Sequence, residues 1–137
     1  MAFTGPMEDR LLIRELYDTY ADCGSRGDRE GWLDCFAEDA RWKTHYFELQ
    51  GREAIAAKYD EIMDAVTDTV FFVQMGAVEV DGDTARVRMQ QDESLLFPNG
   101  STYDLVGEYN DVCVKRDGRW WFRDKVYLVK REKLPEQ

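Results

Sequence analysis

The chain has 137 residues, of which 44 % are hydrophobic and 34 % charged, and its formal net charge is −10. This length and composition predict one folded domain with a core and exclude an intrinsically disordered chain. Nucleic-acid binding requires a basic surface that neutralises phosphates. Because basic residues are outnumbered and scattered here, we expect binding neither to nucleic acid nor to an anionic membrane.

The counts of cysteine and histidine bear on metal sites and on the cell compartment. There are three cysteines, a single histidine and no CxxC spacing, so we expect no metal site. No glycine-rich phosphate loop is present either, and we expect no organic cofactor. The N-terminal stretch MAFTGPMEDR lacks the apolar segment of a secretory signal, and no apolar run approaches the roughly 18 residues of a membrane span. These features predict a cytoplasmic protein with reduced thiols.

A first helix is predicted over residues 7–24. Its apolar stripe has the spacing of one helix face and consists of Leu12, Leu16, Tyr20 and Cys23. Gly24 is expected to end the helix, because glycine readily adopts the left-handed conformation of a C-terminal cap.

Two further helices are predicted in the first half of the chain. Asp28 is expected to cap the second helix, whose pattern continues through GWLDCFAED to residue 39. Residues 40–49 are expected to be extended. A third helix is predicted to follow Gly51 and to end near residue 66.

From residue 69 the hydrophobic pattern changes to a period of two, which is typical of strands. Four strands are expected, at 69–80, 84–97, 101–116 and 119–131. The segments that separate them carry turn signals, namely Asp81-Gly82-Asp83, Asn99-Gly100 and Asp117-Gly118. Helices followed by an antiparallel meander predict a single α+β domain.

Five segments in this order resemble the SnoaL-like family of the NTF2-like superfamily. They are IRELYDTYAD, RGDREGWLDCFAEDARW, GREAI, VEVDGDTARV and GEYNDVCVKRDGRWWF, and the resemblance covers nearly the whole chain. It implies a cone: three N-terminal helices packed in a strongly curved, mainly antiparallel sheet, with a ligand pocket at the open end.

The resemblance is greatest to the dehydratase-like branch, which includes scytalone dehydratase and a dehydrochlorinase. Enzymes of that branch take a proton with a histidine that an aspartate holds in place. Counting along the motifs puts Ser25 at the aspartate position and Phe72 at the histidine position. Both members of the pair are therefore replaced. His45 alternates with Trp42 and Thr44, which are expected to face the pocket, so we expect His45 to point away.

Strand alternation identifies other polar candidates. If Arg86 and Arg88 face water, then Gln91 and Glu93 face the cone interior. A carboxylate in an apolar pocket has a raised pKa and can act as a general acid or base; the alternatives are a bulge or a Glu93 paired with a basic group. A one-residue bulge would bring in Asp92 instead.

The remaining candidates are a cation and several aromatic residues. The resemblance implies that Lys125 matches a basic pocket residue of the dehydrochlorinase, where it could stabilise an oxyanion or a leaving group. Pairing with Glu93 and a place on a solvated strand face are the alternatives. Tyr20 could donate to a substrate oxygen or serve only in packing. The other expected pocket residues are Tyr103, Tyr109, Trp42 and Phe72.

Two classes of function remain open at this point. The first is a cofactor-independent lyase, isomerase or cyclase acting on a small apolar molecule with a carbonyl or hydroxyl group, with Tyr20, Glu93 or Asp92, and Lys125 as catalytic residues and Trp42, Phe72, Gln91, Tyr109 and Ser25 binding the substrate. The second is a non-catalytic binding protein or accessory subunit. In either case we expect a homodimer formed through the outer face of the sheet, to which Trp120 and Phe122 could contribute.

Overall fold

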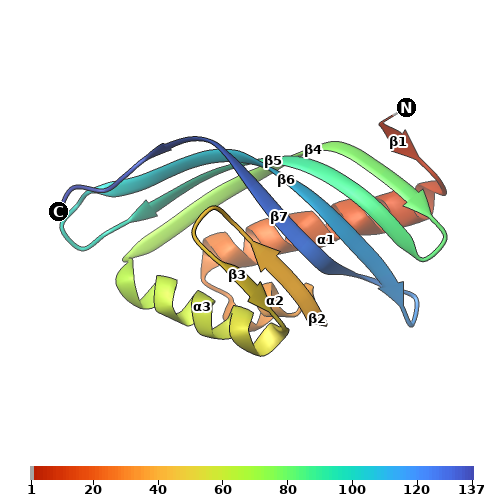
Figure 1. Ribbon diagram of the computed structural model, residues 1–137, viewed down its shortest axis with the longest axis horizontal. Helices are drawn as coiled ribbons and strands as arrows, with labels where there is room; N and C mark the ends of the chain where they lie inside the picture. The colour runs from red at the N-terminus through yellow and green to blue at the C-terminus, as the bar shows by residue number, and fades with distance from the viewer. Residues whose placement is uncertain (1) are drawn as a thin grey trace.

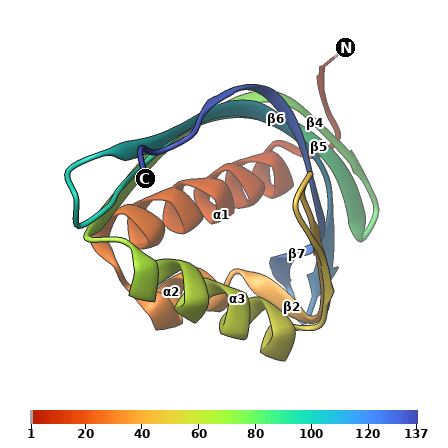
Figure 2. The ribbon, with the colours of Figure 1, turned by 60° about the vertical axis from the view of Figure 1, so that its left-hand side comes forward.

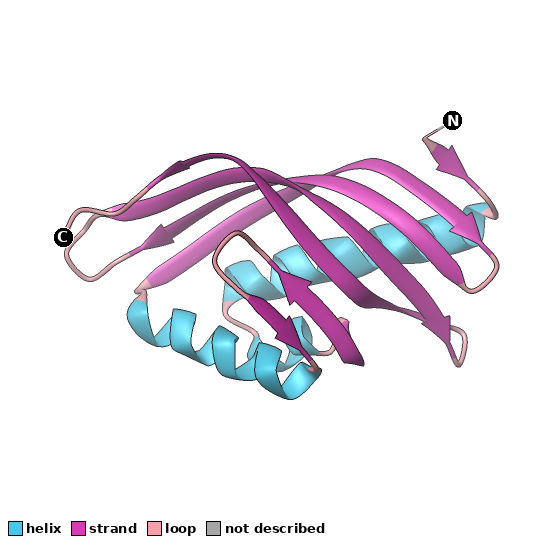
Figure 3. Cartoon of the chain, in the orientation of Figure 1, coloured by secondary structure: helices cyan, strands magenta, loops and turns pink. Residues whose placement is uncertain are grey.

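The computed structural model describes residues 2–137. It contains three helices and a single seven-stranded sheet (Figures 1 and 3). The helices are α1 (Met7–Arg26), α2 (Arg29–Leu33) and α3 (Arg52–Ala65). The strands are β1 (Phe3–Thr4), β2 (Phe36–Lys43), β3 (Glu48–Gln50), β4 (Asp68–Asp81), β5 (Thr84–Leu96), β6 (Thr102–Arg116) and β7 (Arg119–Lys133). Among residues 2–137, no helix is both long and apolar enough to span a membrane.

The sheet is curved, open and mainly antiparallel. Its strand order is β1-β4-β5-β6-β7-β2-β3, in which β4 to β7 form consecutive antiparallel pairs. The short β1 and the strand β2 pair in parallel with β4 and β7, respectively. The sheet bends around α1, and α2 and α3 close the opposite side of the molecule (Figure 2). The expected α+β cone is confirmed.

The first helix is two residues longer than predicted and ends at a different glycine. Gly27, with φ of 72°, is the left-handed C-cap, and its backbone N–H donates to the carbonyls of Cys23 and Gly24. Gly24 therefore lies inside α1, where a Cβ would collide with the ring of Phe71. The prediction that Gly24 ends the helix was wrong, because that glycine serves close packing against β4 rather than a turn.

The second helix is much shorter than predicted. Asp28 caps it as expected, since its side chain accepts a hydrogen bond from Gly31 N at 3.0 Å. The helix ends at Leu33, however, and β2 begins at Phe36, which pairs with Phe122 of β7. Pairing with β7 therefore overrides the local helical pattern of residues 34–39.

The three predicted hairpin turns lie where the turn residues indicate. β4 ends at Asp81 and β5 begins at Thr84, while Asp117 and Gly118 join β6 to β7 with φ of 54° and 75°. Two consecutive positive φ values suit a tight hairpin, which explains the Asp-Gly sequence.

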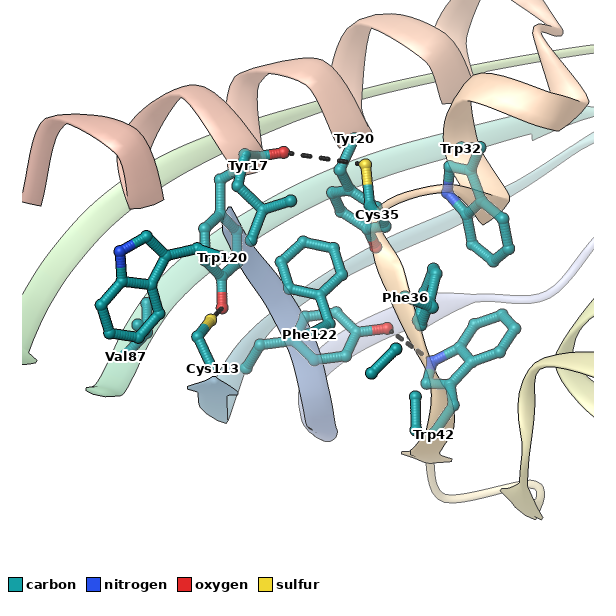
Figure 4. Packing of buried hydrophobic residues seen from close by; sticks show 14 of the residues in the cluster. Tyr17, Tyr20, Trp32, Cys35, Phe36, Trp42, Val87, Cys113, Trp120 and Phe122 are labelled. Carbon is teal, nitrogen blue, oxygen red and sulfur yellow. Dashed lines mark hydrogen bonds between the residues drawn. The ribbon is translucent and has the colours of Figure 1, made fainter. Parts of the chain in front are cut away.

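Aromatic side chains fill the space between α1 and the sheet (Figure 4). Trp120 and Phe122 project from β7 into this core, and their exposed fractions are 2 % and 0 %. They therefore do not lie on the outer face, and the contribution to a dimer that was left open for them is excluded. A homodimer stays a prediction, and the exposed apolar side chains available on that face include Phe72 and Leu128.

Candidate functional site

Two adjoining pockets lie between α3, the turn after β2 and the concave face of the sheet. The inner pocket has a volume of about 60 Å³ and the outer pocket about 390 Å³. The outer volume falls in the range of small-molecule sites, whereas the inner pocket admits only a small group. The side chains that line both pockets are Trp42, Ile62, Glu93, Leu95 and Tyr109.

Glu93 is the carboxylate at the junction of the two pockets. It faces the interior of the sheet, as strand alternation predicts, and it is half-buried and lines both pockets. Burial raises the pKa of Glu93 to about 7, since the surrounding apolar groups disfavour its charge. The next residue toward the N-terminus, Asp92, is exposed on the opposite face and lines neither pocket. Of the two carboxylates, Glu93 and not Asp92 therefore faces the pockets.

Hydrogen bonds orient the polar groups of the inner pocket. Tyr109 Oη accepts from Trp42 Nε1 at 3.1 Å and donates to no residue among 2–137, so its proton is available to a ligand. Tyr20 Oη donates to Gln91 Oε1 at 3.2 Å, which leaves the Gln91 amide Nε2 without a protein partner in the same range. Two donors, the Tyr109 hydroxyl and the Gln91 amide, therefore border the space beside the Glu93 carboxyl.

Lys125 does not reach either pocket. It is completely buried and donates to Asp111 Oδ2 at 2.7 Å, behind the aromatic wall. Its ammonium nitrogen lies 4.0 Å from the ring centre of Tyr109 and 4.7 Å from that of Tyr20. All three alternatives raised for Lys125 are therefore wrong: direct contact with a substrate, pairing with Glu93 and a solvated position.

Asp111 is the buried partner that the sequence reasoning missed. Its carboxylate also accepts from Tyr17 Oη at 2.5 Å and from Val126 N at 3.1 Å. Burial raises the pKa of Asp111 and lowers that of Lys125, and their mutual attraction opposes both shifts. The sequence did indicate an inward position for Asp111, because alternation along the strand places it on the same face as the buried Tyr109 and Cys113.

The two positions counted from the family motifs do not form part of the pocket. Phe72 is 71 % exposed on the outer face, and the ring that enters the pocket belongs to Phe71. Ser25 Oγ accepts from Phe71 N and donates to Phe71 O, so it ties α1 to β4. Gly24, one residue earlier, lines the inner pocket. The residues that line the inner pocket beside the two counted positions are Gly24 and Phe71, so no histidine or aspartate enters the pocket from either place.

His45 lies in the wall of the outer pocket, contrary to the expectation that it points away. The alternation that places Trp42 does not extend to His45, because β2 ends at Lys43 and a turn follows. Tyr103, which was expected to reach the pocket, lines the outer pocket as well.

The hydroxyl of Tyr127 is buried and has no hydrogen-bond partner among residues 2–137. The Tyr127 ring lines the outer pocket, and its hydroxyl end packs against Gly107. An unsatisfied buried hydroxyl costs free energy of the order of 1–3 kcal/mol.

We therefore expect Tyr127→Phe to raise the free energy of unfolding by about 1 kcal/mol. The physical reason is that phenylalanine keeps the ring and removes the unsatisfied oxygen. Urea denaturation followed by tryptophan fluorescence measures the change. The comparison is Tyr46→Phe, which removes an exposed hydroxyl that donates to Glu132 and should therefore bring no gain in stability. A loss of stability in Tyr127→Phe would contradict the expectation and show that the hydroxyl has a partner in solution.

Within residues 2–137, no group of three or more histidine, cysteine, aspartate or glutamate side chains is arranged to hold a metal ion. The polar groups of the pockets instead include the Glu93 carboxyl, an amide, an imidazole, several phenols and two threonine hydroxyls, together with the Lys58–Glu61 ion pair of α3 in the outer pocket. This set can move a proton and hydrogen-bond a ligand oxygen, and it matches a mostly apolar ligand.

Solved structures with the same fold include several proteins with enzyme names. A protein named provisionally as an aromatic ring hydroxylase, from Novosphingobium aromaticivorans, superposes with a TM-score of 0.89 at 20 % identity, covering 97 % of this chain and 96 % of that one. A protein named provisionally as a scytalone dehydratase, from the same organism, superposes with a TM-score of 0.85 at 20 % identity, covering 93 % of this chain and 87 % of that one. A hexachlorocyclohexane dehydrochlorinase from Novosphingobium barchaimii superposes with a TM-score of 0.82 at 15 % identity, covering 95 % of this chain and 91 % of that one. At these identities the similarity shows the fold alone.

The sequence itself carries the family relationship. No curated protein sequence matches the chain significantly. The model of the SnoaL-like domain, however, matches residues 6–126, which is most of the chain. The matched segment runs from the start of α1 into β7 and includes Glu93 and Tyr109. The chain therefore belongs to the SnoaL-like family.

Proposed function

We propose that this protein is a cofactor-independent enzyme that transfers a proton at the carbon next to the carbonyl of a small apolar substrate, as lyases, isomerases and cyclases do. The observation that carries the proposal is Glu93, a carboxyl in an apolar pocket whose pKa is raised to about 7. A general base works best when its pKa lies near the operating pH. The dehydratase and dehydrochlorinase names of proteins with the same fold are in keeping with this class of reaction.

The arrangement of donors supports the same chemistry. When the Glu93 carboxylate takes a proton from the carbon, the electron pair of the broken C–H bond moves toward the carbonyl and forms an enolate. The enolate oxygen can accept hydrogen bonds from the Tyr109 hydroxyl and from the Gln91 amide, both of which border the inner pocket. Donors placed in a site with little water stabilise such a developing charge strongly. Return of the proton from Glu93 to another carbon completes an isomerisation.

Exchange of hydrogen for deuterium tests this proposal without knowledge of the natural substrate. The probe is acetonaphthone, a flat apolar methyl ketone, and proton NMR in deuterated buffer follows the loss of its acetyl signal. We expect the protein to accelerate the exchange and Glu93→Gln to lower the accelerated rate about a hundredfold or more. Asp92→Asn, which changes an exposed neighbour on the other face, is expected to leave the rate unchanged. Equal rates with wild type and Glu93→Gln would refute the role of Glu93.

A binding protein that does not transform its ligand is the second candidate. It is favoured by the replacement of the dyad, since Ser25 and Phe72 stand at the two positions counted from the motifs. Glu93 is moreover the only carboxylate among the described residues that line the inner pocket. Saturable binding of acetonaphthone without any accelerated exchange would support this function over the enzymatic one.

A further inference from the structure

The outer pocket contains a second polar centre that the proton-transfer chemistry at Glu93 does not use. It is built around Glu132 near the end of β7, which accepts hydrogen bonds from His45 Nε2 at 3.0 Å, from Tyr46 Oη at 3.0 Å and from Tyr103 Oη. His45, Tyr46 and Tyr103 all line the outer pocket. Three side chains from two separate segments therefore converge on one carboxylate at the wall of the cavity.

The charge of Glu132 fixes the hydrogen-bonding character of His45. The hydrogen bonds from Tyr103, His45 and Tyr46 lower the pKa of Glu132, so the carboxylate is ionised and can only accept. The proton of a neutral His45 imidazole must then reside on Nε2, which donates to Glu132. Nδ1 is left as an acceptor, and it forms no hydrogen bond within residues 2–137.

The surroundings hold the imidazole in place as part of the pocket wall. The His45 ring stacks on Tyr46, with 4.0 Å between ring centres, and lies 6.2 Å from the ring of Tyr127 on the same wall. The His45 side chain is 26 % exposed. An oriented acceptor beside apolar and aromatic surface recognises a ligand group that can donate a hydrogen bond.

The two polar centres lie in different parts of the cavity. His45 lines only the outer pocket and Gln91 only the inner pocket, whereas Glu93 and Tyr109 lie at the junction. A ligand that fills both pockets therefore meets two donors at its inner end. At its outer end it meets the His45 acceptor on one wall, while on α3 Lys58 and Glu61 pair with each other at 3.0 Å. The inner pocket, at about 60 Å³, has room for a group such as acetyl, and the outer pocket, at about 390 Å³, has room for a ring system.

We propose that His45, held by Glu132, is a recognition site for a ligand hydroxyl, and that the substrate is a ring-bearing apolar molecule with a carbonyl at one end and a hydroxyl at the other. This substrate class rests on the proposed function for the position of the carbonyl. The hydroxyl site itself depends only on the outer pocket, so the two can be tested separately.

The test compares two fluorescent ligands that differ only in one hydrogen-bond donor. They are a hydroxyacetonaphthone, with its hydroxyl and acetyl groups on opposite rings, and its methyl ether. Binding is measured by fluorescence titration at about pH 7.5, which lies above the ordinary pKa of an imidazole and below that of a phenol, so that the ring nitrogen can accept and the phenol can donate. Wild type is expected to bind the phenol about tenfold more tightly than the ether, as one good hydrogen bond provides.

Three variants assign the preference to His45. His45→Phe keeps a flat ring and removes the acceptor, so the ratio of the two affinities should fall to about one. His45→Gln, which can donate to Glu132 and still accept from a ligand, should retain part of the preference. Tyr46→Phe removes only a donor to Glu132 and should keep the ratio. Because the result is a ratio, partial unfolding of a variant would reduce both affinities equally and leave the conclusion intact.

The outcomes separate this proposal from the role of Glu93. Equal binding of phenol and ether to wild type, an undiminished preference in His45→Phe, or no binding of either ligand would overturn the hydroxyl site. Hydrogen exchange of the acetyl group is followed in the same samples. A preference that depends on His45, together with exchange that does not depend on Glu93, would retain the hydroxyl site and reject the proposed function.

Discussion

Lys125→Met is expected to destabilise the folded protein by about 3–5 kcal/mol, the usual cost of removing one partner of a buried ion pair. The Lys125 ammonium and the Asp111 carboxylate are both fully buried, 2.7 Å apart. Methionine fills most of the space of lysine but leaves the Asp111 charge without its counterion. Chemical denaturation monitored by tryptophan fluorescence gives the change in unfolding free energy. Because burial raises the pKa of Asp111, the loss should shrink at acidic pH as this carboxylate takes up a proton.

Two further variants show whether the charge or the packing is responsible. Lys130→Met removes an exposed lysine from the same strand, and it should change the stability by less than about 0.5 kcal/mol. The double variant Lys125→Met/Asp111→Asn removes both charges and keeps an acceptor for Tyr17 and Val126 N. It should be more stable than Lys125→Met alone. If the double variant is as unstable as the single one, lost packing rather than an unpaired charge explains the effect.

Glu93→Gln is expected to stabilise the protein at alkaline pH, by about 1–3 kcal/mol once partial access of solvent is allowed for. Burial raises the pKa of Glu93 from 4.5 to about 7. Below pH 4.5 the carboxyl is protonated in both the folded and the unfolded chain, and it carries no penalty. As the pH rises from 4.5 to about 7, the unfolded chain ionises first, so the wild-type protein loses stability over this interval. Above about pH 7 the penalty is complete.

The measurement is the free energy of unfolding of wild type and Glu93→Gln as a function of pH. The difference between them should grow from about pH 4.5 to about pH 7 and then become constant. Asp92→Asn, at the exposed position next to it, should show no such pH-dependent difference. A constant difference for Glu93→Gln over the whole range would mean that the carboxyl is well solvated, and it would remove the main support for Glu93 as a general base.

Lys125→Met and Glu93→Gln test two buried carboxyl groups, Asp111 and Glu93, which differ in whether the surrounding protein compensates their charge. Asp111 is stabilised by Lys125 and by hydrogen bonds from Tyr17 and Val126 N, and it lies in the core behind the pocket. No residue among 2–137 forms a hydrogen bond with the Glu93 side chain, which faces the pocket. A well-compensated carboxylate serves the fold, whereas an uncompensated one beside a cavity has the perturbed pKa expected of a functional group. This contrast is why the proposed chemistry is assigned to Glu93.

Local patterns in the sequence determined the class of fold and most of its elements. Period-two alternation predicted the four long strands, and the Asp-Gly and Asn-Gly pairs predicted the hairpin turns between them. The same alternation predicted that Glu93 and Gln91 face the interior. These features depend on interactions between residues that are close in sequence, so the sequence alone carries them.

Tertiary contacts decided the features that the sequence left open or indicated wrongly. Pairing of β2 with β7 converted the predicted end of the second helix into a strand, and packing against Phe71 placed Gly24 inside α1. Lys125 is buried because Asp111, 14 residues earlier on the neighbouring strand, compensates its charge. His45 lies at the cavity because Glu132, 87 residues away, binds it across the turn that follows β2. Each outcome depends on a partner that is distant in sequence, and its position is known only once the sheet has curved around α1.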